Sequence, residues 1–430
     1  MPVNDRARAQ AQLIFNGHPG AAAHPAPDRW EDVDDFDYLY REYAVLVRAE
    51  DVEEVTGELG RIFEDAGYGD VPEGEARDIQ REQVSRGLVR LTVPTTPTLV
   101  PDLIGRLDAA LGPGVARPEH KVYVCPNPCP ATEPGVVPSG TTEPVPPPDP
   151  ALRVPWAGNN GSGVNVSVID TGLIPNAAAG HPWLAGVQGT AEEPYTTDSA
   201  GDSVIVPYAG HGTFVAGVLR CVAPKASVYV ERAFDIAGAD YETRLLGSLE
   251  DALARDPDIL VFTFTSTTHR DQSLHTFDEL YERRIRSIKG LVVLAPAGNE
   301  GSPRLHWPAA HPGVIAVGAL AANWRDRARF SNYGRWVDVY APGEDLVNAF
   351  PEGTYVCTEP PDVGQRRHFH GMALWSGTSF STPLVAGLIA ARMSQTGENA
   401  SQAADALLRL AASQAIPGVG PVLYPGQALS

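Results

Sequence analysis

The chain has 430 residues, 43% of them hydrophobic, which is enough for two or three domains and a large core. Its formal net charge is −20, from 53 acidic and 33 basic residues, and this argues against nucleic acid or an anionic membrane surface as a partner. The 4 cysteines are too few for a disulfide framework. Free thiols are expected, with a disulfide between Cys125 and Cys129 as the alternative.

The N-terminal segment, residues 1–39, is rich in Ala, Pro and charged residues and is expected to be an acidic, flexible arm. It has no apolar stretch of signal-peptide length, and no later run approaches the ~18 apolar residues of a membrane span. If the chain starts at its native residue, these features predict a cytoplasmic protein with no membrane attachment.

Residues 40–124 have the pattern of a small α+β domain. Strands are predicted over 41–49, 86–94 and 120–125. Apolar residues at helical spacing predict helices over 50–67 and 98–112, and Gly112 ends the second one. The β-α-β-α-β order, with room for a further strand near Ile79, predicts an α+β sandwich.

Residues 125–154 form the clearest domain boundary. Proline is so dense in "CPNPCPATEPGVVPSGTTEPVPPPDP" that neither a helix nor a central strand can form. An extended, semi-rigid linker is therefore expected between the two domains.

The remaining residues, 155–430, alternate between buried strands and helices. Strands are predicted over 163–170, 226–234, 258–265, 291–298 and 313–320, and helices over 212–222, 241–256, 276–290 and 381–395. Continuous apolar strands alternating with helices indicate a mostly parallel sheet that is covered on both faces. The predicted fold class is therefore α/β, with three α/β/α layers, plus the small N-terminal α+β domain.

Four polar groups fall at strand ends or helix starts in this second domain. Asp170 ends a strand, His211 opens a helix, Asn299 follows a strand and Ser379 opens the last long helix. Catalytic groups gather at the carboxyl ends of the strands in open parallel sheets. An acid, a base, an amide and a hydroxyl are the components of an acyl-transfer site.

Each of these groups also has a structural alternative. A strand-ending Asp is often a turn residue, a His beside Gly is often structural, and Asn-Glu-Gly is an ordinary turn. The hydroxyls of "SGTSFSTP" suit helix caps, and Pro383 suits a first helical turn. The order Asp, His, Ser differs from that of chymotrypsin-like enzymes, and no G-x-S-x-G elbow of an α/β-hydrolase surrounds Ser379.

The motifs "VSVIDTG", "GHGTFVAG", "LAPAGNEG" and "SGTSFSTPLVAG" resemble those of subtilases, the subtilisin-like serine proteases, in order and rough spacing. The resemblance covers about residues 155–415. It implies a serine endopeptidase of polypeptides, with Asp170 as orienting acid, His211 as general base and Ser379 as nucleophile. It also implies that the Asn299 side chain and the Ser379 backbone N–H bind the oxyanion.

The resemblance places substrate-binding residues in two stretches. The first is the edge strand with Thr263, Phe264 and Thr265, and the second holds Ala297 and Gly298. In the family the edge strand usually has the pattern Ser-x-Gly, so here a β-branched residue replaces glycine. This substitution is expected to narrow the substrate cleft. A dedicated maturation protease that cuts one partner peptide is therefore an alternative function.

The expected cofactor content is none. Secreted subtilisins insert a calcium-binding loop where this chain has only Val218 to Cys221, so that calcium site is expected to be missing. His368 and His370 have no carboxylate or cysteine partner close in sequence, and no metal site is predicted there.

The domain at 40–124 resembles subtilase propeptides in size and element order. It is predicted to be either a removable propeptide or a retained regulatory domain, in both cases able to dock on the catalytic domain. A further alternative is a latent or inactive subtilase fold that serves as a binding module, its cleft filled by the N-terminal domain.

Overall fold

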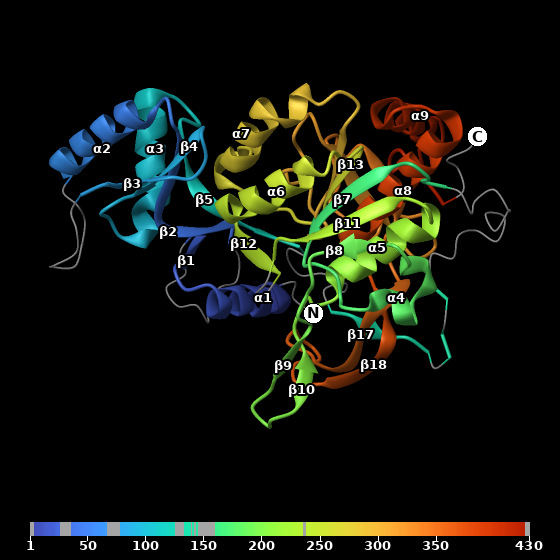
Figure 1. Ribbon diagram of the computed structural model, residues 1–430. Helices are drawn as coiled ribbons and strands as arrows, with labels where there is room; N and C mark the ends of the chain where they lie inside the picture. The colour runs from blue at the N-terminus through green and yellow to red at the C-terminus, as the bar shows by residue number, and fades with distance from the viewer. Residues whose placement is uncertain are drawn as a thin grey trace.

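The computed structural model describes residues 4–25, 36–66, 78–124, 133–138, 140–141, 143–144, 160–234 and 238–425. Most of the Pro-rich segment predicted as a linker, including Cys125 and Cys129, lies outside the described residues. In Figure 1 the N-terminal domain, with α2, α3 and β3, lies beside the larger domain that carries the other helices.

The larger domain is built on a seven-stranded sheet in the order β16-β15-β14-β13-β7-β11-β8. Every neighbouring pair in it is parallel. The strands are β7 (Asn165–Asp170), β8 (Gln188–Gly189), β11 (Ser227–Arg232), β13 (Ile259–Phe262), β14 (Val292–Pro296), β15 (Ile315–Leu320) and β16 (Val339–Pro342). Their apolar residues face cores on both sides, as continuous hydrophobic runs require.

Helices cover both faces of this sheet, which confirms the predicted three-layer α/β/α fold. Helices α5 (His211–Val222), α8 (Thr378–Thr396) and α9 (Ala400–Ser413) share one core with the sheet. Helices α6 (Leu245–Ala254) and α7 (His275–Arg283) pack on the opposite face (Figure 1). Short helical turns lie at Pro97–Leu99, Ala177–Gly180 (α4), Pro182–Leu184, Glu242–Arg244, His269–Asp271 and Ile285–Ser287.

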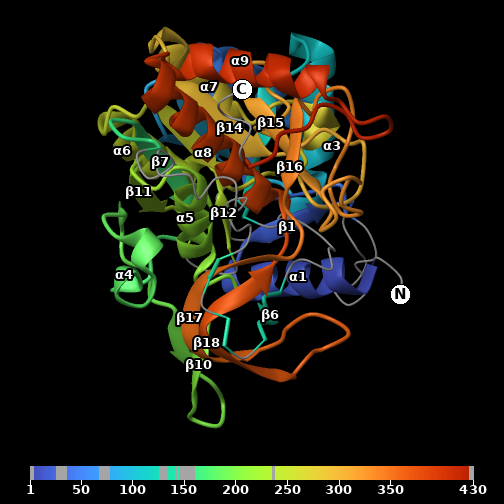
Figure 2. The same ribbon diagram turned by 90° about the vertical axis from the view of Figure 1, so that its right-hand side faces the viewer.

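A second, smaller sheet was not anticipated from the sequence. Strands β17 (Leu346–Val356) and β18 (Arg366–Trp375) form a long antiparallel hairpin. On one side it is extended by β10 (Ser203–Ile205) and β9 (Tyr195–Thr197), and on the other by β6 (Gly135–Val136). Figure 2 shows β6, β10, β17 and β18 together below the main sheet.

The N-terminal domain is an antiparallel sheet with two helices on one face. Its strands are β1 (Ala21–His24), β2 (Tyr38–Arg48), β3 (Gln80–Gln83), β4 (Leu88–Thr92) and β5 (Ala116–Tyr123), and its helices are α2 (Val52–Ala66) and α3 (Val100–Leu111). The sheet order is β12-β5-β2-β4-β3, with β1 on β2. Strand β12 (Ala239–Tyr241) belongs to the larger domain, so a single sheet crosses the domain boundary.

The N-terminal arm is structured where the chain is described, unlike the expectation for residues 1–39. Helix α1 (Asn4–Gly17) precedes β1. Ala11 and Ile14 of this helix are buried in a cluster with Leu39, Tyr123 and Ala239. A small apolar face is therefore enough to order a segment whose overall composition is polar. Within the described residues, no helix is both long and apolar enough to cross a membrane.

Candidate active site

Asp170 and His211 form a fully buried pair. Asp170 is the last residue of β7 and His211 is the first residue of α5, so sheet topology brings them together. The Nδ1 atom of His211 lies 2.8 Å from Asp170 Oδ1 and 2.9 Å from Oδ2, and both side chains are 0% exposed. An Asp carboxylate that accepts from Nδ1 leaves Nε2 as the imidazole nitrogen that takes up a proton.

Aromatic side chains fix the plane of the His211 ring. Its centroid lies 5.3 Å from that of Trp375, at right angles, and 5.1 Å from that of Phe380. Phe214, at the position where the family often has a second His, packs 4.5 Å from Phe380. These contacts and the Asp170 carboxylate together hold the imidazole in one orientation.

Ser379 lies in the first turn of α8, where the helix dipole is positive. Its Oγ donates to the backbone carbonyl of Val124 at 2.9 Å and also lies 3.2 Å from the carbonyl of Thr263. Val124 directly follows β5 of the N-terminal domain. The hydroxyl of Ser379 therefore faces a peptide group of the chain's own N-terminal domain.

The other hydroxyls of this cluster serve the backbone. Ser376 Oγ accepts from the N–H of Asp345 at 2.9 Å. Ser381 and Thr382 donate to backbone carbonyls at 3.0 Å and 2.8 Å. The structural reading of the hydroxyl cluster holds for these three residues, whereas Ser379 points to the cleft.

The amide of Asn299 is fixed from one side. Its Oδ1 accepts from both the backbone N–H and the Oγ of Thr378, each at 2.9 Å. Because two donors contact this atom, it must be the amide oxygen, and the NH₂ group is on the other side. An amide donor held in this way beside the start of α8 suits an oxyanion that forms at Ser379.

Ala297 and Gly298 set the position of Asn299. The N–H of Ala297 continues the strand pairing to Val317 at 2.9 Å, and the N–H of Gly298 donates to Thr378 Oγ at 3.2 Å. Gly298 has a φ of +97°, and a Cβ there would lie 2.4 Å from the amide nitrogen of Asn332. Only glycine fits this turn.

The three residues predicted on the edge strand have different environments. Thr263 is 0% exposed and its hydroxyl donates to the carbonyl of Ile169 at 2.8 Å, while Phe264 lies in the core beneath the N-terminal domain. Thr265 exchanges two backbone hydrogen bonds with Tyr123, at 3.0 and 3.2 Å. A β-branched residue at Thr265 therefore still allows an extended segment to pair in the cleft.

The end of β5 is the middle strand of a three-stranded antiparallel arrangement, which the sequence did not predict. Tyr123 pairs with Thr265 on one side and with Ala239 of β12 on the other. The N–H of Val124 donates to the carbonyl of Gly238 at 2.9 Å. The only feature of the sequence that pointed to this arrangement was a predicted strand that ends directly before the Pro-rich segment.

Glu192 is a further buried acid near the pair, and no motif marked it. It accepts from the N–H of Gly210, the residue before His211, at 2.9 Å. Burial raises the pKa of Glu192 to about 8, although the hydrogen bond from Gly210 lowers it. This carboxyl is therefore largely protonated near neutral pH, so that it adds little charge next to Asp170.

No metal site emerges from the described part of the chain. The described residues contain no group of three or more His, Cys, Asp or Glu side chains placed so that they could hold a metal ion. His368 and His370 lie side by side on β18 with ring centroids 4.8 Å apart. Helix α5 runs without interruption through Val218 and Cys221, the place considered for a calcium loop.

The larger domain is similar in sequence to known proteins. The profile of the subtilase family, peptidase S8, matches residues 161–419. Subtilisin NAT of Bacillus subtilis subsp. natto is 32% identical over 251 residues, which make up 55% of this chain and 57% of that protein. The chain thus spans little more than half the length of that relative. Subtilisin of Bacillus pumilus is 31% identical over 252 residues, 55% of this chain and 79% of that protein.

A solved structure extends the similarity beyond the larger domain. Fervidolysin from Fervidobacterium pennivorans, a keratinolytic enzyme related to subtilisin, aligns with a TM-score of 0.55 at 18% identity. The alignment covers 91% of this chain and 61% of that chain, which shows a shared fold that includes N-terminal elements. Because the family profile matches more than half of this chain, the chain belongs to the subtilase family.

Proposed function

We propose that this protein is a serine endopeptidase that hydrolyses peptide bonds with Asp170, His211 and Ser379, and that its N-terminal domain blocks the cleft. One observation carries the proposal. A backbone carbonyl, that of Val124, lies 2.9 Å from Ser379 Oγ in a cleft whose edge strand pairs with the same segment. An extended polypeptide thus occupies the position that a substrate needs.

The residues present account for both half-reactions. Ser379 Oγ attacks the carbonyl carbon of the substrate while His211 Nε2 takes its proton, and the carbonyl oxygen becomes an oxyanion. The Asn299 amide and the Ser379 backbone N–H donate to that oxyanion. His211 then protonates the departing amine, and water attacks the acyl-enzyme with His211 again as base, which releases the acid and restores Ser379.

Several contacts support a docked, inhibitory N-terminal domain. Tyr38 of β2 hydrogen-bonds to His269 at 2.8 Å, and both side chains are buried. Three ion pairs cross the boundary at 2.7 to 2.9 Å: Arg117–Asp278, Arg270–Asp108 and Arg304–Asp37. Such partly exposed ion pairs contribute little to stability, and their main effect is to fix the orientation of the N-terminal domain on the larger domain.

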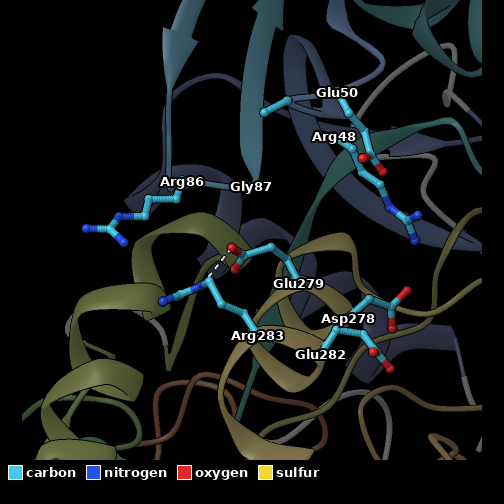
Figure 3. A pocket seen from close by; sticks show the side chains of 9 residues that line it. Arg48, Glu50, Arg86, Gly87, Asp278, Glu279, Glu282 and Arg283 are labelled. Atoms are coloured by element: carbon cyan, nitrogen blue, oxygen red, sulfur yellow. Dashed lines mark hydrogen bonds and ion pairs between the residues drawn. The ribbon is translucent and has the colours of Figure 1, made fainter.

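The boundary also contains a cavity lined mainly by charged residues, which suits a domain that can leave. A cavity of about 560 Å³ lies between α7 and the loops of the N-terminal domain. Figure 3 shows its charged lining, with Arg48, Glu50, Arg86 and Gly87 on one side and Asp278, Glu279, Glu282 and Arg283 on the other. A continuous apolar core is therefore missing over this part of the boundary.

The filled cleft also favours a second candidate, a latent subtilase fold used as a binding module. The test is labelling of the full chain by a fluorophosphonate, compared with Ser379→Ala and with Tyr123→Pro. Proline at 123 removes the N–H that pairs with Thr265 and should expose Ser379. We expect labelling that increases in Tyr123→Pro and is lost in Ser379→Ala.

No labelling of folded Tyr123→Pro protein would contradict the peptidase and favour the binding module. Cleavage of a peptide library then separates the remaining alternatives. Cleavage at many sequences supports a general endopeptidase, whereas cleavage of one narrow set supports a maturation protease.

A further inference from the structure

The carboxylate of Glu133, in the Pro-rich segment, is held by a ring of donors on the β17–β18 hairpin. Its Oε1 accepts from the backbone N–H of Thr358 at 2.6 Å and from that of Glu359 at 3.3 Å. The hydroxyls of Thr358 and Tyr355 add bonds at 3.2 and 3.1 Å. Four donors on one carboxylate oxygen, two of them backbone N–H groups, form a cradle selective for an anion.

The residues after Glu133 bind through their backbone. The carbonyl of Pro134 accepts from the guanidinium of Arg367 at 2.9 Å. Gly135 and Val136 then pair antiparallel with Leu374 and Ala373 of β18. This is addition of a strand to a sheet edge, a mode in which backbone bonds give affinity and side-chain pockets give selectivity.

Among the described residues, the Pro-rich segment pairs with only a small part of the edge of β18. Strand β6 has 2 residues whereas β18 has 10. Beside it lies a cavity of about 660 Å³ whose lining runs from Glu133 and His368 to Trp375 and Ser376. Trp375 of this lining also packs against His211, with ring centroids 5.3 Å apart.

The chain is thus held at two places, at Ser379 and at the β17–β18 hairpin. Val124 contacts Ser379, and Glu133 is in its cradle nine positions later along the chain. Nine extended residues span at most ~30 Å, so one continuous polypeptide can reach both sites. The same reach is open to any substrate that lies in the cleft in the same direction.

We propose that the cradle at Thr358–Glu359 and the edge of β18 form an exosite for polypeptides, the β18 exosite, which takes an acidic residue from the part of a substrate that follows the cleaved bond. In this structure the linker fills it with Glu133. The substrate role rests on the proposed peptidase function, while the binding of an acidic peptide does not. The preferred ligand is an extended segment with Glu about nine positions beyond the residue at Ser379.

Gly135 lies close to the edge of β18. A Cβ at this position would lie 3.4 Å from the backbone oxygen of Leu374, an ordinary van der Waals contact, so displacement of the linker needs a larger change than alanine. Glu133→Ala with Gly135→Pro should therefore displace the linker, because the first change removes the carboxylate and the second removes an N–H and adds bulk.

The binding test uses the full chain with Ser379→Ala, so that no probe is cut. The probe is a fluorescent peptide of the sequence PATEPGVVP, residues 130–138. We expect the chain with Glu133→Ala and Gly135→Pro to bind it at least tenfold more tightly than the chain with an intact linker, whose own Glu133 competes. Glu143→Ala, on the same linker, is the matched control and should bind like the intact chain.

Two variants test the cradle itself in the displaced-linker chain. A probe with Gln in place of Glu should bind about tenfold more weakly, and Tyr355→Phe, which removes one donor and keeps the ring, should weaken binding several-fold. Absence of binding to the displaced-linker chain, or equal binding of the Glu and Gln probes, would overturn the exosite whether or not the protein is a peptidase.

The kinetic test separates the exosite from the proposed function. With active displaced-linker protein, a substrate that has Glu nine positions after its residue at Ser379 should show a KM about tenfold below that of the Gln version, with similar kcat. Cleavage with equal KM for both would refute the exosite and leave the peptidase intact. Binding without cleavage of either would refute the peptidase and leave the exosite.

Discussion

At the scale of single residues, the site depends on a few side chains whose partners fix their chemical roles. His211 is oriented by Asp170, and the oxygen of the Asn299 amide is held by two groups of Thr378. The proposed role of each group follows from two facts: which of its atoms already form hydrogen bonds, and which atoms remain able to contact a substrate.

Replacement of Asn299 by Ala should lower kcat by about 10²- to 10³-fold and change KM little, because its amide contacts only the oxyanion of the transition state. The measurement is steady-state hydrolysis of a peptide by a variant with an opened cleft, such as Tyr123→Pro. The control is Asn323→Ala, which changes an exposed turn and should keep the full rate. A higher KM with unchanged kcat would contradict the oxyanion role.

Lys121 on β5 gives the docked state a dependence on pH. Its side chain is 0% exposed, has no hydrogen-bond partner among the described residues, and lies 3.8 Å above the ring of Tyr241. Burial lowers the pKa of Lys121 from 10.5 to about 7. The native state therefore binds fewer protons than the unfolded state between these pH values, and stability should rise with pH there.

We predict a slope of about 1.4 kcal/mol per pH unit between pH 7 and 10 from this single group. Lys121→Met keeps the length of the side chain and should remove this contribution. The measurement is urea unfolding of the Ser379→Ala chain with and without Lys121→Met across this range. Identical slopes in both chains would show that Lys121 is charged in the native state.

At the scale of elements, two segments outside the main sheet lie close to the candidate site. Val124, directly after β5, contacts Ser379, and α1 packs on that strand through Ala11 and Ile14, which share a cluster with Tyr123. The end of β5 thereby contacts both the larger domain and a helix from the N-terminal part of the described chain.

Ile14→Asp should loosen the end of β5, because a carboxylate cannot remain in this apolar cluster without a large cost. We expect the rate of peptide cleavage in trans to increase several-fold over wild type. The matched control is Asn16→Asp, an exposed change of the same charge on the same helix. Equal rates in wild type and Ile14→Asp would show that α1 does not hold the strand.

At the scale of the whole molecule, the chain is held at Val124, by Ser379, and again at Glu133, by the β17–β18 hairpin. We predict that purified wild type contains a break between residues 124 and 133 that Ser379→Ala lacks, as seen by intact mass. Because both sides of the break remain bound to the larger domain, the two pieces should elute together in size-exclusion chromatography. A wild-type chain of full mass would contradict self-cleavage.

Much of the larger domain could be predicted from sequence because its signals are local. Fully apolar strands and amphipathic helices alternate from 163 onward, and each predicted strand lies in the parallel sheet. The hairpin β17–β18 was missed because its strands mix polar and apolar residues and pair mainly with each other. Helix α1 was missed since only two of its described residues are buried.

The sequence by itself determined the order of catalytic candidates and the α/β layers, because motifs and hydrophobic periodicity are properties of neighbouring residues. Only the tertiary structure decided what fills the cleft and where the linker binds. Tyr123 meets Thr265, and Glu133 meets Thr358, across more than 140 and 220 positions of chain. Such pairings depend on complementary backbone edges and converging donors, which local sequence patterns do not encode.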